Sequence, residues 1–342
     1  MSRITVAIVN FNGRHLLERH LPAVVAQRGV DFDIVLADGG SSDGSRELLQ
    51  SEYPAVRVLP LEGNPGFAAA NNRILEATTT PLIALLNNDA SPEPGWLAAL
   101  QSAAANHPEF GMFASRMVFH HDPAVINSAG ISLDRAGIAW DRHVGRRDTG
   151  PTGEVFGPSA GAALYRRKLF EEVGDFDESF FAYLEDVDLA WRARLAGWRC
   201  LYVAEATVRH EHSATGAEGS PFKNFHLGRN KVWTILKNYP LPQLLYLAPL
   251  IALYDLAAIP LTLLRSRDPA ILRGRLAALW HWRTAWRQRR RIHSRRHISG
   301  SEFRRLTDGF QSPLGLYRRY RDLHRVLAVR DSPESPGNTP PL

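Results

Sequence analysis

The stretch Leu85-Leu86-Asn87-Asn88-Asp89 decides the fold prediction, because it is an apolar run that stops at an acidic tip. Pro81 precedes the run and three polar residues end it, which is typical of a short buried strand. In α/β sheets, ligands bind at the carboxyl edge, where such a strand places its last side chains. The stretch therefore predicts a strand over Leu82–Leu86 with a ligand-binding carboxylate, Asp89, just after it.

A second acidic group opens an apolar, helix-like segment further along the chain. It reads Phe181-Ala182-Tyr183-Leu184-Glu185-Asp186-Val187-Asp188-Leu189. If this group reaches the same sheet edge as Asp89, the two segments supply one metal-binding acid and one base. Together they indicate a metal-assisted reaction.

Strand-like runs alternate with helical patterns through the first third of the chain. This alternation predicts an α/β fold, with a mostly parallel, Rossmann-like sheet flanked by helices on both faces. The turn after the first strand reads Asn10-Phe11-Asn12-Gly13 and lacks the G-x-G-x-x-G pattern, which disfavours a dinucleotide-binding fold. The predicted strands are Ile4–Val9, Asp33–Ala37, Val56–Leu59 and Leu82–Leu86, and the predicted helices are Arg14–Gln27, Ser45–Gln50 and Phe67–Ala77.

Beyond Gly111 the pattern becomes a mixture of strands and loops. Helical stripes return at Arg167–Val173 and Glu185–Ala196. Two separate strands are predicted after them, Arg199–Val203 and Thr207–Arg209, followed by a loop that ends near Phe222.

The charge of the chain is unevenly distributed. The 342 residues carry a net charge of +6, but Arg265–Leu342 alone holds 18 Arg, no Lys and six Asp or Glu, which leaves the preceding part acidic. An acidic body argues against a protein that grips nucleic acid with its main face. A basic tail fits a domain held at an anionic membrane surface. The single Cys200 suits a reducing compartment, and no secretory signal precedes the first strand.

Six short motifs occur in an order that resembles family 2 glycosyltransferases with the GT-A fold, in the branch that includes bacterial rhamnosyltransferases. The resemblance covers 4–240 and implies an α/β catalytic domain over 1–240. The motifs are Val9–Gly13, Asp38–Gly44, Asn64–Phe67 with Asn71-Asn72, Asn87–Asp89, Gly174–Glu178 and Glu185–Leu189.

The resemblance implies a nucleotide-sugar donor at the ends of the first two strands. Asp38 would accept a hydrogen bond from the base or the ribose, and the alternative is a turn or helix-capping acid. Asn10 and Phe11 would flank the base, although Phe11 also suits an ordinary strand end. Asp43 reads better as a capping acid than as a ligand contact.

The resemblance also implies a divalent cation, Mn²⁺ or Mg²⁺, on the donor diphosphate. Asp89 takes the last position of the family's D-x-D element, whereas Asn87 replaces its first acid, and an amide is a weaker ligand. Asn87 would therefore contact ribose or a metal-bound water. His210 would complete the metal site, matching better than His212, and imidazole favours Mn²⁺. The alternative for His210 is a structural histidine at a strand end.

Asp186 is the candidate catalytic base. Sugar transfer requires the acceptor hydroxyl to lose its proton as it attacks, and one carboxylate suffices if a metal stabilises the leaving group. The resemblance assigns the base to Asp186, with Glu185 orienting it, and implies inversion at the anomeric carbon. Asp188 lies four residues before Arg192, a spacing that favours an intrahelical ion pair.

Small and amide side chains complete the predicted site. Gly161, in the turn Gly157–Ala162, would let the backbone approach the bound sugar. Asn64, Asn71 and Asn72 are candidate diphosphate-side or structural amides. Phe180, Phe181 and Tyr183 would stack on a sugar face or pack in the core.

The segment after Pro240 is predicted to be a helical extension over 241–330, followed by a disordered tail over 331–342. Leu241–Leu264 is apolar but holds three prolines and Asp255, which argues against a membrane-spanning helix. Tryptophans that alternate with arginines after residue 279 favour contact with the cytoplasmic face of the membrane. The alternative is a soluble appendage that packs on the catalytic domain.

The sequence therefore predicts an inverting, metal-dependent glycosyltransferase. It would use a UDP- or dTDP-sugar, with dTDP-rhamnose among the candidates, and a glycan or lipid-linked glycan acceptor in cell-surface polysaccharide synthesis. The alternative is a non-catalytic nucleotide-sugar-binding or scaffold protein. A nucleotidyltransferase would need a Gly-rich basic loop after the first strand, and the sequence has none there.

Overall fold

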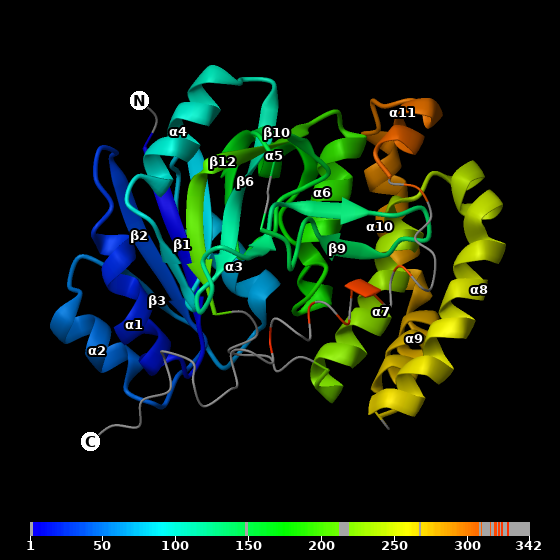
Figure 1. Cartoon of the computed structure of the whole chain (residues 1–342), viewed down its shortest axis with the longest axis horizontal. Helices are drawn as coiled ribbons and strands as arrows, with labels where there is room; N and C mark the ends of the chain where they lie inside the picture. The colour runs from blue at the N-terminus through cyan, green and yellow to red at the C-terminus, as the bar shows by residue number, and fades with distance from the viewer. Residues whose placement is uncertain are drawn as a thin grey trace.

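The computed structural model describes residues 3–147, 150–211, 219–266 and 268–307, together with a few single residues between 309 and 327. The predicted tail over 331–342 and His212 lie outside the described residues. Figure 1 shows a sheet on one side of the molecule and a group of helices, α7 to α10, on the other.

A ten-stranded sheet forms the centre of the molecule. Eight of its strands follow the order β10-β12-β6-β11-β4-β1-β2-β3, while β5 pairs with β12 and β7 pairs with β6. The strands β3, β2, β1 and β4 run parallel, as predicted, whereas β11 runs antiparallel between β4 and β6. The strands are β1 (Ile4–Asn10), β2 (Phe32–Asp38), β3 (Arg57–Pro60), β4 (Leu82–Asn87), β5 (Ala90–Pro92), β6 (Phe110–Phe119), β7 (Ile126–Ser128), β10 (Gly153–Val155), β11 (Ala162–Arg166) and β12 (Arg199–His210). A separate hairpin joins β8 (Ile131–Leu133) to β9 (Ala139–Asp141).

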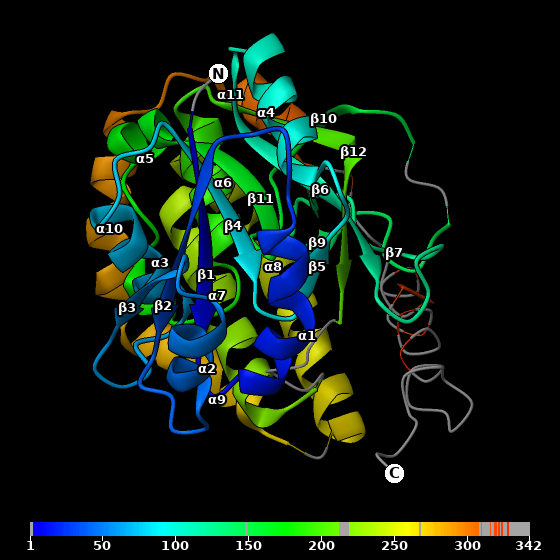
Figure 2. The same cartoon turned by 90° about the vertical axis from the view of Figure 1, so that its left-hand side faces the viewer.

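Helices cover both faces of the sheet, which confirms the predicted layers. Alternate residues of β1 point to opposite faces, so Ile4, Val6 and Ile8 join one apolar cluster and Ala7 joins the other. The first cluster includes α1 (Arg14–Val25), α2 (Ser45–Glu52) and α4 (Trp96–Asn106), and the second includes α3 (Phe67–Glu76), α5 (Arg167–Val173) and α6 (Glu185–Leu195). Figure 2 views these layers from the side of β3 and α2.

The strand β12 differs from the prediction of two strands separated by a break. It runs unbroken from Arg199 to His210, with a register shift against β6 between Val203 and Thr207. Because a β-bulge absorbs extra residues without ending the strand, the predicted break is wrong. The continuous strand carries His210 to the same end of the sheet as Asp89.

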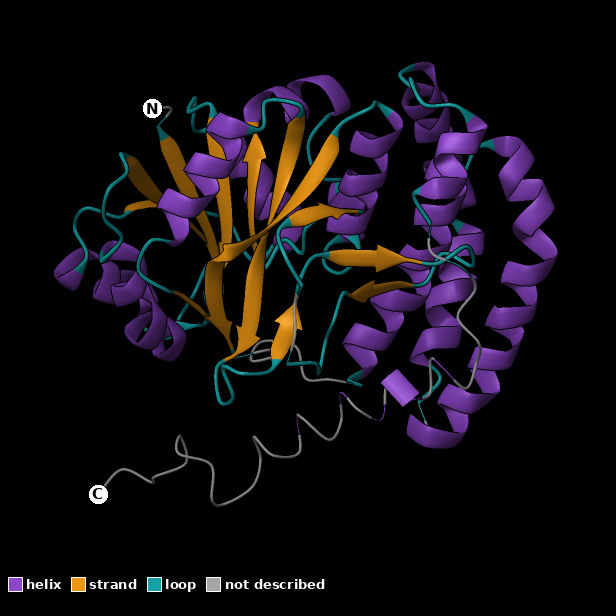
Figure 3. Cartoon of the chain, turned by 45° about the horizontal axis from the view of Figure 1, so that its top comes forward, coloured by secondary structure: helices purple, strands orange, loops and turns teal. Residues whose placement is uncertain are grey.

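The C-terminal region is helical, as predicted, and packs against the sheet domain (Figure 3). Phe303 stacks on Trp191 of α6 with ring centroids 4.9 Å apart, so the helices share a core with the domain before them. The helices are α7 (Pro221–Asn238), α8 (Leu241–Ser266), α9 (Ala270–Trp280), α10 (Trp282–Ser294) and α11 (Gly300–Arg305).

Two glycines allow α7 and α9 to approach closely. A Cβ atom on Gly228 would lie 2.6 Å from the carbonyl oxygen of Ile271, and one on Gly274 would lie 2.2 Å from that of Phe225. Between the same helices, the Trp233 indole donates a hydrogen bond to the Ala278 carbonyl. The contact between α7 and α9 is therefore backbone against backbone.

The central acid of α8 faces the protein interior. Asp255 pairs with Lys231 of α7 at 2.6 Å and with Arg275 of α9 at 2.8 Å. In the described part of the chain, no helix combines the length and the apolar character needed to cross a membrane.

Candidate functional site

The parallel register of the sheet brings the predicted donor residues to one edge. Asn10 at the end of β1 is paired with Asp38 at the end of β2, and Val9 is paired with Asn87 at the end of β4. The carboxyl ends of these strands therefore place Asn10, Asp38 and Asn87 side by side, where the sequence predicted a ligand site.

Asp38 is fully buried at the centre of a hydrogen-bond network. Its carboxylate accepts bonds from Asn10 (3.1 Å), from the Ser41 hydroxyl (2.6 Å) and amide (3.0 Å), and from Arg46 (2.7 Å). Burial alone would raise the pKa of Asp38, but the bonds from Ser41, Asn10 and Arg46 lower it overall. The carboxylate is ionised and holds the loop after β2 in place.

The loop after β1 is fixed against the loop after β2. Asn12 has a positive φ of 49° and its amide side chain accepts a hydrogen bond from the Ser42 backbone. Phe11 is 38% exposed beside it. Asp43 accepts bonds from the backbone of Arg14 and of Ser45, so it acts as a capping acid at these helix starts.

The amide side chains predicted to bind the diphosphate or to be structural have different surroundings. Asn64 accepts a bond from the Gly66 backbone in a turn, and Asn71 donates to the Phe67 carbonyl within its own helix. Asn88, which the sequence analysis did not select, donates to Asn10 at 2.9 Å and links the ends of β1 and β4.

Asp89 and His210 meet directly at the sheet edge. Nε2 of His210 lies 3.0 Å from Oδ1 of Asp89, and both side chains are buried. Burial alone would raise the pKa of Asp89, but the charge of His210 and its hydrogen bond lower it to about 2. Burial likewise opposes protonation of His210, yet the Asp89 charge raises the pKa of its imidazole overall.

Asn127 sets the orientation of the His210 ring. Its amide oxygen lies 2.8 Å from Nδ1 of His210, while Nε2 faces Asp89 and the Asn87 amide at 3.4 Å. A ring fixed in this way presents Nε2 as the available ligand atom. Asn127 carries no signal in the sequence, because it lies on the short strand β7 outside every recognised motif.

Asp186 lies at the start of α6 and is partly exposed. Its carboxylate accepts hydrogen bonds from the Ala160 backbone at 3.1 Å and the Val187 backbone at 2.7 Å. Burial raises the pKa of Asp186 to about 6, despite these bonds. A carboxylate with this pKa is ionised at neutral pH and still basic enough to take a proton.

Glu185 has a different environment from its neighbour. It is buried, and burial together with the charge of Asp186 raises its pKa well above the usual range. In the part of the chain that the structure describes, no hydrogen bond joins Glu185 to Asp186, which is held by backbone amides instead.

The loop before α6 is strained and is held by α7. Phe181, Tyr183 and Leu184 all have positive φ angles of 65–68°, which non-glycine residues rarely adopt. The amide of Asn230 donates to the carbonyls of Phe180, Ala182 and Tyr183. Such strain persists only when neighbouring groups impose it, and it is common next to catalytic residues.

The predicted aromatic contacts of this loop divide into two kinds. Phe180 is fully buried against Trp233 and belongs to the core. Phe181 stacks on His226 at 5.5 Å, and Tyr183 packs edge-on against Phe222.

A continuous series of contacts connects Asp186 to the Asp89–His210 pair. Asp186 binds the backbone of Ala160, the carbonyl of Gly161 accepts from the backbone of Asn87, and Asn87 approaches His210, the partner of Asp89. A Cβ on Gly161 would lie 3.3 Å from the Asn87 amide, so this turn is in close contact with the site.

Asp141, at the end of β9, also belongs to this region. Its charge acts on both Asp186 and His210, raising the pKa of each. Asp141 was missed in the sequence because it lies in the mixed region after Gly111, where no motif marks it. It borders a cavity of 640 Å³ whose lining includes Arg142, Arg146 and Arg305.

Comparison with known proteins connects this geometry to an activity. The profile of glycosyl transferase family 2 matches residues 5–174. The N-acetylglucosaminyl-diphospho-decaprenol L-rhamnosyltransferase of Mycobacterium tuberculosis is 32% identical over 239 residues, which cover 62% of this chain and 77% of that protein. The pre-mycofactocin glycosyltransferase of the same species is 31% identical, over 61% of this chain and 43% of its own length.

Solved structures share the fold at low sequence identity. A mannosyltransferase from Pyrobaculum calidifontis, in complex with GDP-Man and Mn²⁺, superposes with a TM-score of 0.52 at 19% identity and covers 86% of each chain. GalNAc-T7 with UDP, GalNAc and Mn²⁺ gives a TM-score of 0.57 at 17% identity, over 69% of this chain and 48% of its own. This chain therefore spans about half the length of GalNAc-T7.

Proposed function

Because the chain belongs to glycosyl transferase family 2 and has the GT-A fold, we propose that it transfers a sugar from a UDP- or dTDP-sugar to a hydroxyl of a lipid-linked glycan. The observation that carries the proposal is the contact of Asp89 with His210 at the carboxyl edge of the sheet, with Asp186 bonded to the adjoining turn at Ala160. The similarity to a rhamnosyltransferase favours dTDP-rhamnose as the donor.

The donor diphosphate is assigned to the Asp89–His210 pair. One carboxylate and one imidazole form a donor set that suits Mn²⁺ or Mg²⁺, and Asn127 already directs Nε2 of His210 toward Asp89. A cation held there would supply charge stabilisation for the departing nucleoside diphosphate. Asn87, an amide, contributes through a hydrogen bond from its side chain rather than as an ionised ligand.

The nucleoside is assigned to the ends of β1 and β2. Asp38, Asn10 and the exposed Phe11 form this part of the edge. Asp38 already accepts four hydrogen bonds, which uses the acceptor capacity of a carboxylate, so it acts by shaping the loop that receives the base.

Asp186 is assigned as the base of a direct displacement. Its carboxylate takes the proton of the acceptor hydroxyl while that oxygen attacks the anomeric carbon and the bond to the diphosphate breaks. A single displacement inverts the anomeric configuration. Glu185, which is buried and disposed to be neutral, contributes no proton transfer in this scheme.

Donor and metal binding are tested together by thermal unfolding. We expect one UDP- or dTDP-sugar, with Mn²⁺, to raise the unfolding temperature, because a ligand at 100 times its Kd stabilises by about 2.7 kcal/mol. Asp89→Asn should abolish the Mn²⁺-dependent part of this shift. Asp31→Asn, an exposed acid that pairs with Arg3, is the matched control and should behave like the wild type. An unchanged shift in Asp89→Asn would remove Asp89 from the site.

The acceptor is assigned to the cavity that Asp141 borders. Its lining of arginines, with Arg142, Arg146 and Arg305 among them, complements the negative charge of a diphosphate. Asp141 lines this cavity, and its charge also acts on Asp186, which supports an acceptor site next to the proposed base. These features support a lipid-diphosphate-linked glycan.

The outer helices are assigned to the cytoplasmic surface of the membrane. Tyr246 and Trp280 are 83% and 84% exposed, and Leu245, Leu253 and Leu256 are also exposed on α8. Figures 1 and 3 show α8 at the outer edge of the helical group. Exposed apolar side chains beside arginines suit a lipid interface, and nucleotide sugars are made in the cytosol.

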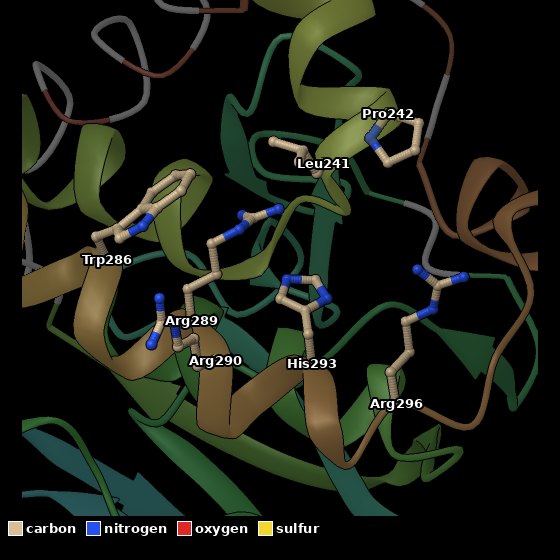
Figure 4. A pocket seen from close by; sticks show the side chains of 7 residues that line it. All are labelled: Leu241, Pro242, Trp286, Arg289, Arg290, His293 and Arg296. Atoms are coloured by element: carbon tan, nitrogen blue, oxygen red, sulfur yellow. The ribbon is translucent and has the colours of Figure 1, made fainter.

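A cationic pocket of 440 Å³ lies between α10 and the start of α8. Arg289, His293 and Arg296 project toward Leu241 and Pro242 across it (Figure 4). Neither Asp89 nor Asp186 lines this pocket. The positive charge of its arginines fits a phosphate of an anionic lipid.

Membrane binding is tested by sedimentation with lipid vesicles. We expect the full chain to bind vesicles that contain anionic phospholipid and to bind neutral vesicles weakly. The double variant Tyr246→Ser and Trp280→Ser should reduce binding by at least about tenfold, because it removes two large apolar groups from the interface. Val25→Ser, an exposed apolar residue on α1, is the control. Equal binding by the wild type and the double variant would contradict this assignment.

A further inference from the structure

A second group of side chains that can bind a metal lies next to the Asp89–His210 pair. His20 belongs to α1, His120 follows β6, and Glu211 follows β12. One ligand atom from each of the three residues lies within 4.8 Å of the others. Three distant segments thus bring two imidazoles and a carboxylate to one point.

The two histidines present buried ring nitrogens at this point. His20 is 1% exposed, and its Nδ1 lies 2.7 Å from the Ser91 hydroxyl. This bond turns the other ring nitrogen, Nε2, toward Oε1 of Glu211 at 3.2 Å. Neither Nε2 of His20 nor Nδ1 of His120 has a well-formed hydrogen bond within the described residues. Buried polar atoms without such bonds are rare in proteins and call for a ligand.

The backbone of the catalytic centre holds these residues in place. The Glu211 amide donates to the carbonyl of Asp89 at 3.0 Å, and the His120 amide donates to that of His210 at 2.9 Å. The positions of Glu211 and His120 are therefore fixed by the same residues that carry the proposed donor cation.

We propose that His20, His120 and Glu211 form a second cation site, distinct from the Asp89–His210 pair. Two imidazoles and a carboxylate with one open position are a typical ligand set for zinc, whereas Mg²⁺ prefers oxygen ligands alone. Ser91 fixes the ring of His20, as partners of metal-ligating histidines commonly do. The ligand class is a first-row transition cation, and Zn²⁺ is the probe.

Arg19 is the competitor for this site. Its guanidinium binds Oε1 of Glu211, and 56% of its side chain is exposed. The ordinary interpretation of the cluster is an ion network of Arg19, His20 and Glu211. Because the Arg19 side chain is exposed, a bound cation can displace its guanidinium from Oε1 of Glu211 into solvent.

The site is tested by titrating Zn²⁺ into the untagged full-length protein after chelator treatment, using calorimetry. We expect one tight site whose affinity falls more than 100-fold in His120→Ala and in Glu211→Gln. Ser91→Ala should weaken it roughly 10–100-fold, the effect of losing a group that orients a ligand. Arg19→Gln, which removes the competitor, should keep or raise the affinity.

Two further measurements separate this site from the donor site and from misfolding. Asp89→Asn should retain tight Zn²⁺ binding, and Co²⁺ in place of Zn²⁺ should give the visible absorption of a four-coordinate ion. The thermal unfolding of each metal-free variant verifies its fold. The proposal is overturned if His120→Ala and Glu211→Gln bind Zn²⁺ like the wild type, or if the tight site disappears in Asp89→Asn.

Discussion

Asp186→Asn is expected to lower the turnover of sugar transfer by roughly 10²–10⁴-fold, the usual contribution of a general base. An asparagine has nearly the same shape and its amide oxygen can keep one of the two backbone hydrogen bonds, from Ala160 or from Val187, but it cannot take a proton. Donor binding should therefore stay close to that of the wild type, since Asp186 does not touch the Asp89–His210 pair. Initial rates and a donor titration on the same preparation measure both quantities.

The pH dependence gives this prediction a second readout. Burial raises the pKa of Asp186 to about 6, so the ionised form that accepts a proton is lost as the pH falls through that value. We expect kcat/KM of the wild type to fall below about pH 6, with the limb absent from the residual activity of Asp186→Asn. Glu185→Gln is the neighbouring control and should retain most of the turnover. Unchanged turnover in Asp186→Asn would remove the base assignment.

Asp188→Asn is expected to lower the free energy of unfolding by about 3–5 kcal/mol, the usual cost of breaking a buried charge pair. Asp188 is completely buried and accepts bonds from Arg192 (2.9 Å), Lys237 (2.9 Å) and Asn238 (2.8 Å). With asparagine at position 188, the buried Arg192 and Lys237 would lose their shared carboxylate. Lys237 would keep its bond to Asp177. Urea denaturation followed by circular dichroism measures the change.

The control for this prediction is an acidic residue between α5 and α6. Asp175 is exposed, so replacing its carboxylate with an amide breaks no buried charge pair. Asp175→Asn should therefore change the unfolding free energy by less than about 0.5 kcal/mol. A stability loss in Asp188→Asn no larger than that of Asp175→Asn would show that the buried network is energetically neutral.

The intrahelical pair of Asp188 with Arg192 was correctly predicted from its spacing, but its true extent was not. A helical period reveals neighbours within α6, whereas Lys237 and Asn238 reach Asp188 from a helix about fifty positions later in the chain. Local pattern carries no information on such a contact.

The fold was predicted best where strands and helices alternate at short spacing. The predicted cores of β1, β2 and β4 agree with the structure, because each is a short apolar run bounded by polar residues. The antiparallel insertion of β11 and the bulge in β12 were not predictable, since both depend on pairing with β6 rather than on local sequence.

The candidate site was predicted from motifs, and its supporting residues were not. Asp89, His210 and Asp186 stand in recognisable stretches. Asn127, which orients His210, and Asn230, which holds the loop before Asp186, act through tertiary hydrogen bonds that leave no mark in the sequence. The roles of Asn127 and Asn230 can therefore be recognised only in the three-dimensional structure.

The helix α7 holds the strained loop before α6 through hydrogen bonds from Asn230, and it packs closely on α9 at Gly228 and Gly274. A chimera that exchanges C-terminal segments between relatives must therefore carry residues 221–280 as one block. A junction placed at Pro240 would pair a foreign α9 with the native α7. Any side chain larger than glycine at position 274 would then push the two helices apart and loosen the loop before Asp186. For the same reason, truncation after Tyr239 would disturb the loop before Asp186 as well as the proposed membrane contact, so point substitutions on the outer surface are needed to separate the two.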